Sequence, residues 1–414
     1  MEFLKLSREE YHEFEKNHPL REFMNAVEAY DAKILNGWDA EFVGVKEDGE
    51  VLAAALLTSI PVFKIFRYFY AQRGLLLDFK DEKLLKFFTS ELKKYCKSKK
   101  GLYLVTDPAI MHKEMDIEGK LIPNGYDNSY IIDLMKNNGW EHNENTPGYG
   151  GAAYIRYIFS LYINNRSKEE VLKSFHTRTK RSITKTVKNS IAVRELSLDE
   201  IEIFLQMMDE TADRRSFDKK THASFKNIVK AYGNHGKLLL AYLDVEVFKE
   251  NLIKEKANLL NELANTEKRI AQIPDSEKLK KRYATTIESI KSIDDKLVEA
   301  DNLKTEYGNI INMATSFFTI YDNEIVYVYG GTNDNFRKYF APYALQWHMI
   351  CHAVDNNINK YNFYGISGIF DKNANDYGVY EFKRGFSGVV EKYIGDFTLP
   401  IRPLAYKLYR HLKR

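Results

Sequence analysis

The most regular pattern of hydrophobic and polar positions lies in residues 247–306. Apolar or small residues recur there at intervals of three, four and seven, first from Leu252 to Ile273 and again from Leu279 to Ala300. This spacing, close to 3.5 residues, is typical of the seam of a two-helix coiled coil. Pro274 cannot continue a helix and Ser276 can cap the next one, so we predict two antiparallel helices, each about 40 Å long. Charged residues of both signs fill the other positions, which indicates an arm that projects into water as a spacer, a dimerisation element or a recruiting device.

The rest of the chain alternates between strand-like and helix-like patterns in two similar halves. The first half starts its sheet with a hairpin over 41–63 and continues through an amphipathic helix, 81–100, to a buried strand, 101–108. In the second half, strands 237–244 and 311–321 take the place of the hairpin, and the whole arm lies between them. Hairpin turns are exposed and tolerate insertions. We therefore predict an α/β (α+β) fold, in which two mixed units are joined and an antiparallel coiled-coil arm is inserted into the second.

Several further elements and the domain bounds follow from the same patterns. Helices are expected at 22–37, 198–215, 222–233 and 336–357, strands at 155–163, 360–368 and 389–397, and a loop at 143–151. The predicted domains are a first unit, a second unit in two pieces, the arm, and a C-terminal tail helix, with the bounds 1–150, 151–245 with 308–395, 246–307, and 396–414.

Composition narrows the class of protein. The chain is 44% hydrophobic and 14% aromatic, as expected for folded domains with real cores, and its formal net charge is only +3. A basic binding site would therefore have to be local. Cys96 and Cys351 are far apart and have no partner motif, which argues against disulfides and fits a reducing compartment. The apolar run 51–63 is too short to span a membrane, so we expect a soluble, cytoplasmic protein.

One segment, 176–190, concentrates positive charge. Five cations occupy about three helical turns, and threonine or serine fills most of the gaps between them: Arg178, Lys180, Arg181, Lys185 and Lys188. Such residues neutralise phosphates and donate hydrogen bonds to them, which indicates contact with phosphate groups or RNA. A solvated basic helix is the alternative.

Three weaker motifs could also carry chemistry. Arg214 stands near the end of a predicted helix, where a fork-shaped donor can bind phosphate, although a surface salt bridge is equally compatible. Gly330 and Gly331 follow a strand and allow close approach to the backbone. Lys383 lies between aromatic residues next to a glycine turn, where it could hold a phosphate or a developing oxyanion. The alternative for that segment is a half-exposed strand with a snorkelling lysine.

The motifs AEFVGVKEDGEVLAAALL, IFRYFYAQRGLLLDF, LYLVTDP, IVYVYGGTNDNFRKYFAPYALQWHMI, YNFYGISGIF and EFKRGFSG occur in this order with the coiled coil among them. Together they resemble the FemABX family across nearly the whole chain. The resemblance implies two GNAT-like subdomains and a helical arm. It also implies transfer of an amino acid from aminoacyl-tRNA to the stem-peptide lysine, or to the growing bridge, of a lipid-linked peptidoglycan precursor.

The resemblance also implies roles for particular residues. Lys33 matches the lysine that binds the substrate phosphates, and Asp107 matches a strand-end aspartate that would orient or deprotonate the amine. Phe382 and Lys383 match a Phe-Lys pair, in which the lysine would stabilise phosphate or oxyanion charge. Arg214 matches a phosphate-binding arginine, with Ala212 in place of the usual glycine. The remaining implied substrate-binding residues are Tyr103, Tyr329 and Gly330.

The implied reaction is aminolysis of an ester that is already activated, so positioning and charge stabilisation should suffice, and we expect neither a cofactor nor a metal ion. The expected partners are aminoacyl-tRNA, carried by the basic segment 176–190, the lipid-linked precursor at the inner face of the membrane, and related transferases. Two other functions fit the same sequence: a coenzyme A-dependent GNAT acetyltransferase, or an adaptor that recruits a partner through its coiled coil. The sequence leaves open whether glycine, alanine or serine is transferred.

Overall fold

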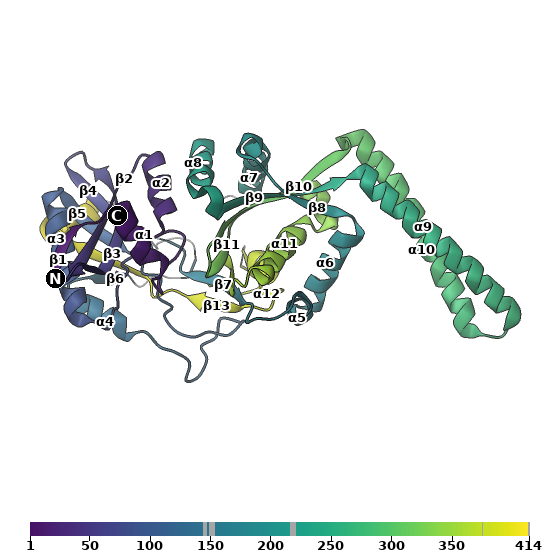
Figure 1. Cartoon of the computed structure of the whole chain (residues 1–414), viewed down its shortest axis with the longest axis horizontal. Helices are drawn as coiled ribbons and strands as arrows, with labels where there is room; N and C mark the ends of the chain where they lie inside the picture. Colours follow the sequence, from purple (N-terminus) through teal and green to yellow (C-terminus); the bar gives the residue numbers. More distant parts are fainter. Residues whose placement is uncertain (144–146, 149–153, 216–220, 375, 413–414) are drawn as a thin grey trace.

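The structure, a computed structural model, describes residues 1–143, 147–148, 154–215, 221–374 and 376–412. Two mixed β-sheets lie side by side, helices cover them, and a long two-helix arm projects from the far end of the second sheet (Figure 1). The predicted fold class is confirmed. The domain boundary at residue 150 and most of the predicted loop 143–151 lie outside the described residues.

The two sheets share one strand order. Along the first sheet the strands are β1 (Glu2–Lys5), β2 (Asp39–Glu47), β3 (Glu50–Val62), β4 (Phe66–Ala71), β5 (Gly101–Thr106), β14 (Asp396–Pro400) and β6 (Glu141–Asn143). Along the second sheet they are β8 (Ile191–Glu195), β9 (Gly236–Asp244), β10 (Ile310–Ile320), β11 (Glu324–Thr332), β12 (Lys360–Ile366), β7 (Tyr157–Tyr162) and β13 (Val389–Lys392). In each sheet the fourth and fifth strands are parallel and all other pairs are antiparallel. The two sheets, with the helices that cover them, therefore form two similarly built subdomains.

The sixth position of each sheet is filled by a strand from a distant part of the chain. In the second sheet the sixth strand is β7, which precedes the edge strand β8 in the sequence. In the first sheet the sixth strand is β14, which follows β13 of the second sheet in the sequence. Gly395, between β13 and β14, has a φ of +104°, a conformation that residues with a Cβ rarely adopt. The predicted single strand 389–397 is therefore two strands in different sheets. The predicted tail helix 396–414 is likewise a strand followed by helix α13 (Pro403–Leu412).

Hydrophobic faces of the helices bury both surfaces of the first sheet. Helices α1 (Arg8–Lys16) and α2 (Val27–Leu35) cover one face, while α3 (Glu82–Ser98) and α4 (Tyr130–Asn137) pack on the other. The helix predicted over 22–37 begins only at Val27. Asn25 and Glu22 explain this difference, because their side chains accept hydrogen bonds from nearby backbone amides and so compete with helix formation.

The second sheet is enclosed in the same way. Its helices are α5 (Lys168–Ser174), α6 (Thr177–Lys188), α7 (Ile201–Arg215), α8 (His222–Tyr232), α11 (Ala341–Asp355) and α12 (Tyr377–Arg384), with short 3-10 turns η1 (Leu198–Glu200), η2 (Gly233–His235) and η3 (Asp334–Tyr339). The helix predicted over 336–357 is interrupted at Phe340, whose φ is +58° and which directly precedes the first turn of α11. Helix α12 was not expected. Tyr380 and Lys383, buried three residues apart, reveal its helical period.

The arm consists of α9 (Val245–Gln272) and α10 (Glu277–Tyr307), inserted between β9 and β10 as predicted. Most of its buried positions belong to the predicted seam, namely Leu252, Thr266, Leu279, Thr286, Ile293 and Ala300. Val245, Phe248 and Leu303 are buried at the base of the arm and lie outside that seam. Ser276 caps α10 through the amide of Leu279. Ion pairs cross between the helices, among them Lys249 with Asp301 at 2.6 Å and Arg282 with Glu262 at 2.7 Å. The arm is therefore neutralised largely within itself.

Candidate functional site

A cleft opens where the two subdomains meet. Helices α2 and α8 stand side by side at this junction (Figure 1), and Asn227 of α8 donates a hydrogen bond of 2.8 Å to the Leu35 carbonyl at the end of α2. The cavity below them has a volume of about 250 Å³. Its walls come from both subdomains: Phe23, Met24, Ala29, Ala32, Lys33, Asn36, Trp38 and Gln72 from the first, and Tyr154, Ser224, Ile228, Tyr232, Phe317, Val328 and Tyr329 from the second.

Lys33 supplies the positive charge of this cleft. Its ammonium group lies 4.5 Å from the centre of the Trp38 ring and 5.8 Å from that of Tyr70. An ammonium group over aromatic faces is attracted by the rings and so held in a preferred orientation. Lys33 and Tyr329, both predicted to bind substrate, therefore line the same cavity.

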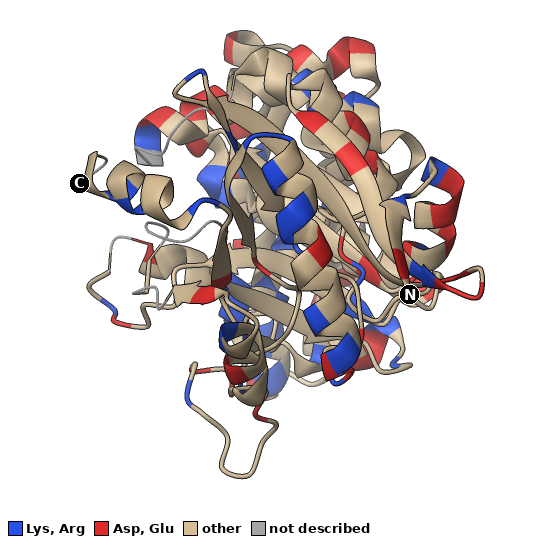
Figure 2. Ribbon diagram, turned by 90° about the vertical axis from the view of Figure 1, so that its left-hand side faces the viewer, with Lys and Arg blue, Asp and Glu red and all other residues tan. Residues whose placement is uncertain are grey.

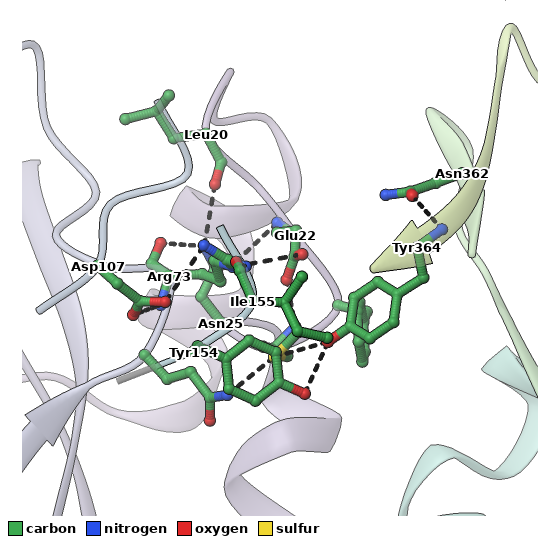
Figure 3. Close-up of polar contacts among 12 residues, drawn as sticks. Leu20, Glu22, Asn25, Arg73, Asp107, Tyr154, Ile155, Asn362 and Tyr364 are labelled. Atoms are coloured by element: carbon green, nitrogen blue, oxygen red, sulfur yellow. Dashed lines mark hydrogen bonds and ion pairs between the residues drawn. The ribbon is translucent and has the colours of Figure 1, made fainter. Parts of the chain in front are cut away.

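Asp107 is buried beneath the cleft in an ion cluster, which we call the junction cluster and which consists of Glu22, Arg73 and Asp107 (Figure 3). Asp107 Oδ1 accepts hydrogen bonds from the Tyr70 hydroxyl at 3.0 Å and the Arg73 amide at 2.9 Å. Asp107 Oδ2 lies 3.2 Å from Arg73 Nη1. Because Tyr70 also lies beneath Lys33, one ring joins the two residues that the sequence singled out.

Burial dominates the electrostatics of the junction cluster. It raises the pKa of Asp107 to about 6 and that of Glu22 to about 7, although the positive charge of Arg73 opposes both shifts. Arg73 also donates a hydrogen bond of 2.6 Å to the Ile155 carbonyl, and its guanidinium lies 3.8 Å from the centre of the Tyr393 ring. Ile155 and Tyr393 flank the two crossings of the chain between the sheets, so this cluster ties the subdomains together.

Lys383 lies in the second subdomain, where β11 and β12 separate. The two strands pair only between Glu324–Val326 and Lys360–Asn362, and their outer ends diverge. Lys383 is buried and donates a hydrogen bond of 2.6 Å to the Gly365 carbonyl on the diverging part of β12. Phe382, the other half of the predicted Phe-Lys pair, packs against Tyr343 with ring centroids 4.9 Å apart.

The remaining predicted residues of β11 and α7 are held by protein contacts. Arg214 pairs with Asp334 at 3.0 Å and donates a hydrogen bond of 3.0 Å to the Thr332 hydroxyl. A Cβ at Gly330 would lie 1.9 Å from the Tyr327 hydroxyl, so this glycine makes room for a tyrosine of its own strand.

Tyr103 lies apart from the cleft cavity. Its ring packs on Tyr68 of β4 at 5.0 Å and on Tyr406 and Tyr409 of α13 at 4.9 and 5.5 Å. Tyr68 in turn lies 6.2 Å from Trp38, which lines the cavity. Tyr103 is therefore connected with the Lys33 cavity through a row of aromatic rings.

The predicted basic helix is α6, and it faces a second and larger concavity of about 590 Å³, here called the basic concavity. Its lining comes from α6, the base of the arm and η3: Thr177, Lys180, Arg181, Thr184, Lys185, Lys188, Asn189, Phe248, Lys296, Glu299, Lys338 and Tyr339. Glu299 already pairs with Lys338 at 2.6 Å. Among the described residues, no acid lies within ion-pair distance of Arg181, Lys185 or Lys188, so the surface keeps a strong positive charge.

Helix α6 is also joined to the helix that carries Lys383. The His176 amide, which precedes α6, donates a hydrogen bond of 3.0 Å to the carbonyl of Gly385, the residue after α12. A Cβ at Gly385 would lie 2.2 Å from the Thr179 hydroxyl of α6. The basic concavity and Lys383 are thus held on neighbouring, tightly packed helices.

Sequence reasoning missed several residues of both concavities. Trp38, Gln72 and Tyr154 have no local signal, because they come together only when the two subdomains pack. Lys296 and Lys338 join the basic concavity because the arm returns to the body beside η3. A second buried ion cluster was missed too: Lys360 lies between Glu324 and Glu391, at 3.2 and 3.0 Å.

Comparison with known proteins decides the family. The sequence matches the FemAB family over residues 6–414. The chain belongs to this family. It is 36% identical over 417 residues to Aminoacyltransferase FemA of Staphylococcus epidermidis and 33% identical over 415 residues to Aminoacyltransferase FemA of Staphylococcus aureus. In both comparisons all of this chain and 99% of the relative are covered.

A solved structure supports the fold assignment. The crystal structure of FemX superposes with a TM-score of 0.83 at 21% identity, covering 99% of each chain. This FemAB-family chain is accordingly an aminoacyltransferase, and a purely non-enzymatic adaptor role is set aside. Among the described residues, no helix has the length and apolar character needed to cross a bilayer, and no group of acidic, cysteine or histidine side chains is arranged to hold a metal ion.

Proposed function

We propose that this FemAB-family protein transfers glycine, alanine or serine from aminoacyl-tRNA to a lipid-linked peptidoglycan precursor, at the stem-peptide lysine or the growing bridge. The observation that carries the proposal is the packing of the basic concavity against the helix of Lys383. A polyanion bound on α6 and the arm base would hold its end beside Lys383, a buried lysine that is hydrogen-bonded to the diverging part of β12.

The donor end of the reaction is assigned to the second subdomain. Lys180, Arg181, Lys185 and Lys188, with Arg178 at the start of the helix, would neutralise backbone phosphates of the tRNA acceptor stem without reading its sequence. The arm supplies Lys296 to this surface from its base. Its self-neutralised outer part favours contact with a protein, such as a related transferase, over a broad RNA contact.

The acceptor end is assigned to the cleft between subdomains. Lys33 would bind the diphosphate of the precursor, and the apolar and aromatic walls around Trp38 and Tyr329 would enclose adjoining parts of the molecule. Both oxygens of Asp107 are already engaged by Arg73 and Tyr70. We therefore favour the orienting role over proton abstraction for Asp107: it holds Tyr70 beneath Lys33.

The chemistry requires a bond exchange at one carbonyl carbon. The acceptor amine attacks the ester carbonyl of the aminoacyl-tRNA, an amide bond forms, the bond to the terminal ribose oxygen breaks, and that oxygen takes up a proton. Lys383, whose ammonium group donates a hydrogen bond to the Gly365 carbonyl, would stabilise the oxyanion or a nearby phosphate through its positive charge. Since the precursor is lipid-linked, the enzyme would work at the inner surface of the membrane.

A reconstituted reaction tests the proposal. The purified protein is incubated with lipid-linked precursor and with tRNA charged separately with glycine, alanine or serine, and the product is identified by mass spectrometry. We expect one charged tRNA to extend the precursor by a single amide-linked residue. No extension by any of the three would contradict the proposal. Extension with acetyl coenzyme A in place of charged tRNA would favour an acetyltransferase instead.

A further inference from the structure

The first subdomain carries a patch of exposed apolar side chains. It combines the turn between β3 and β4 with the outer face of α13, and we call it the terminal patch. Its members and exposed fractions are Phe63 at 58%, Ile65 at 64%, Leu404 at 87%, Leu408 at 62% and Leu412 at 68%. Few other large apolar side chains among the described residues are as exposed, so most of the strongest apolar exposure is gathered in two short segments.

Direct contacts make these two segments one surface. The Phe63 ring lies 5.5 Å from that of Tyr409 on α13, and the Arg402 guanidinium lies 5.8 Å from the Phe66 ring. The three leucines are spaced by four residues and so form one stripe along the helix. The opposite face of α13 is occupied by Tyr406 and Tyr409, which pack on Tyr103. The helix is thus anchored by its inner face and leaves its leucine stripe to solvent.

The charges within the two segments of the patch all have one sign. Neither residues 61–67 nor residues 401–412 contain an aspartate or glutamate, whereas Lys64 and Lys407 are exposed beside the apolar side chains. Among the residues that the structure describes, the acids paired with these segments lie outside them: Glu141 with Arg410 at 3.2 Å, and Asp39 with Arg67. In Figure 2 the helix that runs toward the C-terminus shows blue bands and no red ones.

An apolar stripe beside lysines matches one kind of partner better than others. Apolar side chains enter the boundary between headgroups and acyl chains, while lysines meet anionic headgroups at the same level. Protein interfaces, in contrast, are depleted of lysine near their centre. We propose that the terminal patch docks this protein on an anionic lipid bilayer, an inference that rests on the proposed function for its setting, a substrate held at the membrane.

The patch is also continuous with the acceptor cleft. Ring contacts lead from Tyr409 to Tyr103 at 5.5 Å, from Tyr103 to Tyr68 at 5.0 Å, and from Tyr68 to Trp38 at 6.2 Å, beside Lys33. A row of aromatic rings would therefore connect a bilayer that covers the terminal patch with the Lys33 cavity.

Flotation with lipid vesicles tests the docking directly. The full chain is mixed with vesicles of phosphatidylglycerol and phosphatidylcholine, or of phosphatidylcholine alone, and the bound fraction is measured. We expect binding to the anionic vesicles only. The double variant L404S/L408S should weaken it by about 10- to 100-fold, since two leucines no longer leave water. Lys64→Glu with Lys407→Glu should weaken it as well and reduce its salt dependence.

Val298→Ser, which changes an apolar side chain of the arm that is 61% exposed, is the matched control and should bind as the wild type does. Turnover of L404S/L408S with a water-soluble precursor analogue should remain unchanged, so a failure of the proposed transfer reaction would not affect the vesicle result. Absence of wild-type binding to anionic vesicles, or equal binding by L404S/L408S, would overturn the inference. So would a wild-type dimer, detected by analytical ultracentrifugation, that L404S/L408S dissociates, because the patch would then be a protein interface.

Discussion

The two sheets have the same strand order but treat their parallel pair differently. In the first sheet β4 and β5 stay paired to their ends at Ala71 and Thr106, and Asp107, the next residue, fastens the Arg73 amide. In the second sheet β11 and β12 separate after Val326 and Asn362. Lys383 donates a hydrogen bond to the Gly365 carbonyl on the diverging strand. In the first subdomain the buried charge of Asp107 thus links parts of the structure. In the second subdomain Lys383 lies where the two strands separate.

The buried ion clusters show the same contrast. In the junction cluster, burial outweighs the pull of Arg73 and raises the pKa of both acids. In the second sheet, burial also opposes ionisation of Glu391. Lys360 and hydrogen bonds from Ser160 and Tyr162 nevertheless bring the pKa of Glu391 below its ordinary value. The charge of Lys360, supported by the two hydroxyl donors, therefore outweighs the effect of burial on Glu391.

Removing the cation of the junction cluster should have the largest effect. Arg73→Met leaves Glu22 and Asp107 buried without their counter-ion, and breaking such a cluster costs about 3–5 kcal/mol in the free energy of unfolding. Urea unfolding followed by circular dichroism measures this loss. Arg67→Met, in an outer pair with Asp39, is the control and should cost less than about 1 kcal/mol. Equal stability of the two variants would contradict a structural role for the junction cluster.

Removing Lys383 should lower activity strongly and stability only slightly, the reverse of what we expect for Arg73. Lys383→Met is expected to lower kcat by about 10²- to 10³-fold, the usual cost of losing an oxyanion donor, while unfolding in urea changes far less than in Arg73→Met. Single-turnover assays with charged tRNA and precursor provide the rate. Lys392→Met, a half-buried lysine over the Tyr157 ring, is the matched control and should keep wild-type turnover. Full turnover by Lys383→Met would remove the catalytic assignment.

Charge reversal in the basic concavity should have an intermediate effect. Lys185→Glu combined with Lys188→Glu should raise KM for aminoacyl-tRNA by about 10- to 100-fold and lower the salt dependence of binding, because two phosphate contacts are lost. KM for the precursor should stay the same. The control is Lys93→Glu with Lys94→Glu, which changes two lysines on the exposed face of α3 in the first subdomain. If both double variants behaved alike, the tRNA would have to bind elsewhere.

Much of this arrangement could be predicted from the sequence because it depends on local periodicity. A short window of sequence is enough to predict the arm, the strands between which it is inserted, and the basic helix α6. Helix α12 was not predicted because aromatic residues and glycines around Lys383 obscure the helical spacing of its buried positions. The junction cluster was not predicted because Glu22, Arg73 and Asp107 come from three separate segments of the first subdomain, which only the folded sheet brings together. Pairings that depend on packing between subdomains leave no pattern along the chain.

The smallest expected effect is on the pH dependence of stability. This dependence has opposite signs for Glu22 of the junction cluster and Glu391 of the second cluster. Burial raises the pKa of Glu22 to about 7, from an ordinary value of 4.5, so the folded protein binds this proton more tightly than the unfolded chain does. The stabilisation that results is complete below about pH 4.5 and disappears as the pH rises through about 7.

Glu22→Gln should therefore flatten the fall in the free energy of unfolding between pH 5 and pH 7.5, measured by urea titrations at both values. Asp107, whose pKa is about 6, leaves part of the slope in place. Glu391→Gln is the matched variant in the second sheet. Its carboxylate has a lowered pKa and stabilises the fold above its ordinary value, so this variant should lose stability most at neutral pH and least in acid. Parallel pH profiles for the two variants would show that the clusters do not differ in the way their contacts indicate.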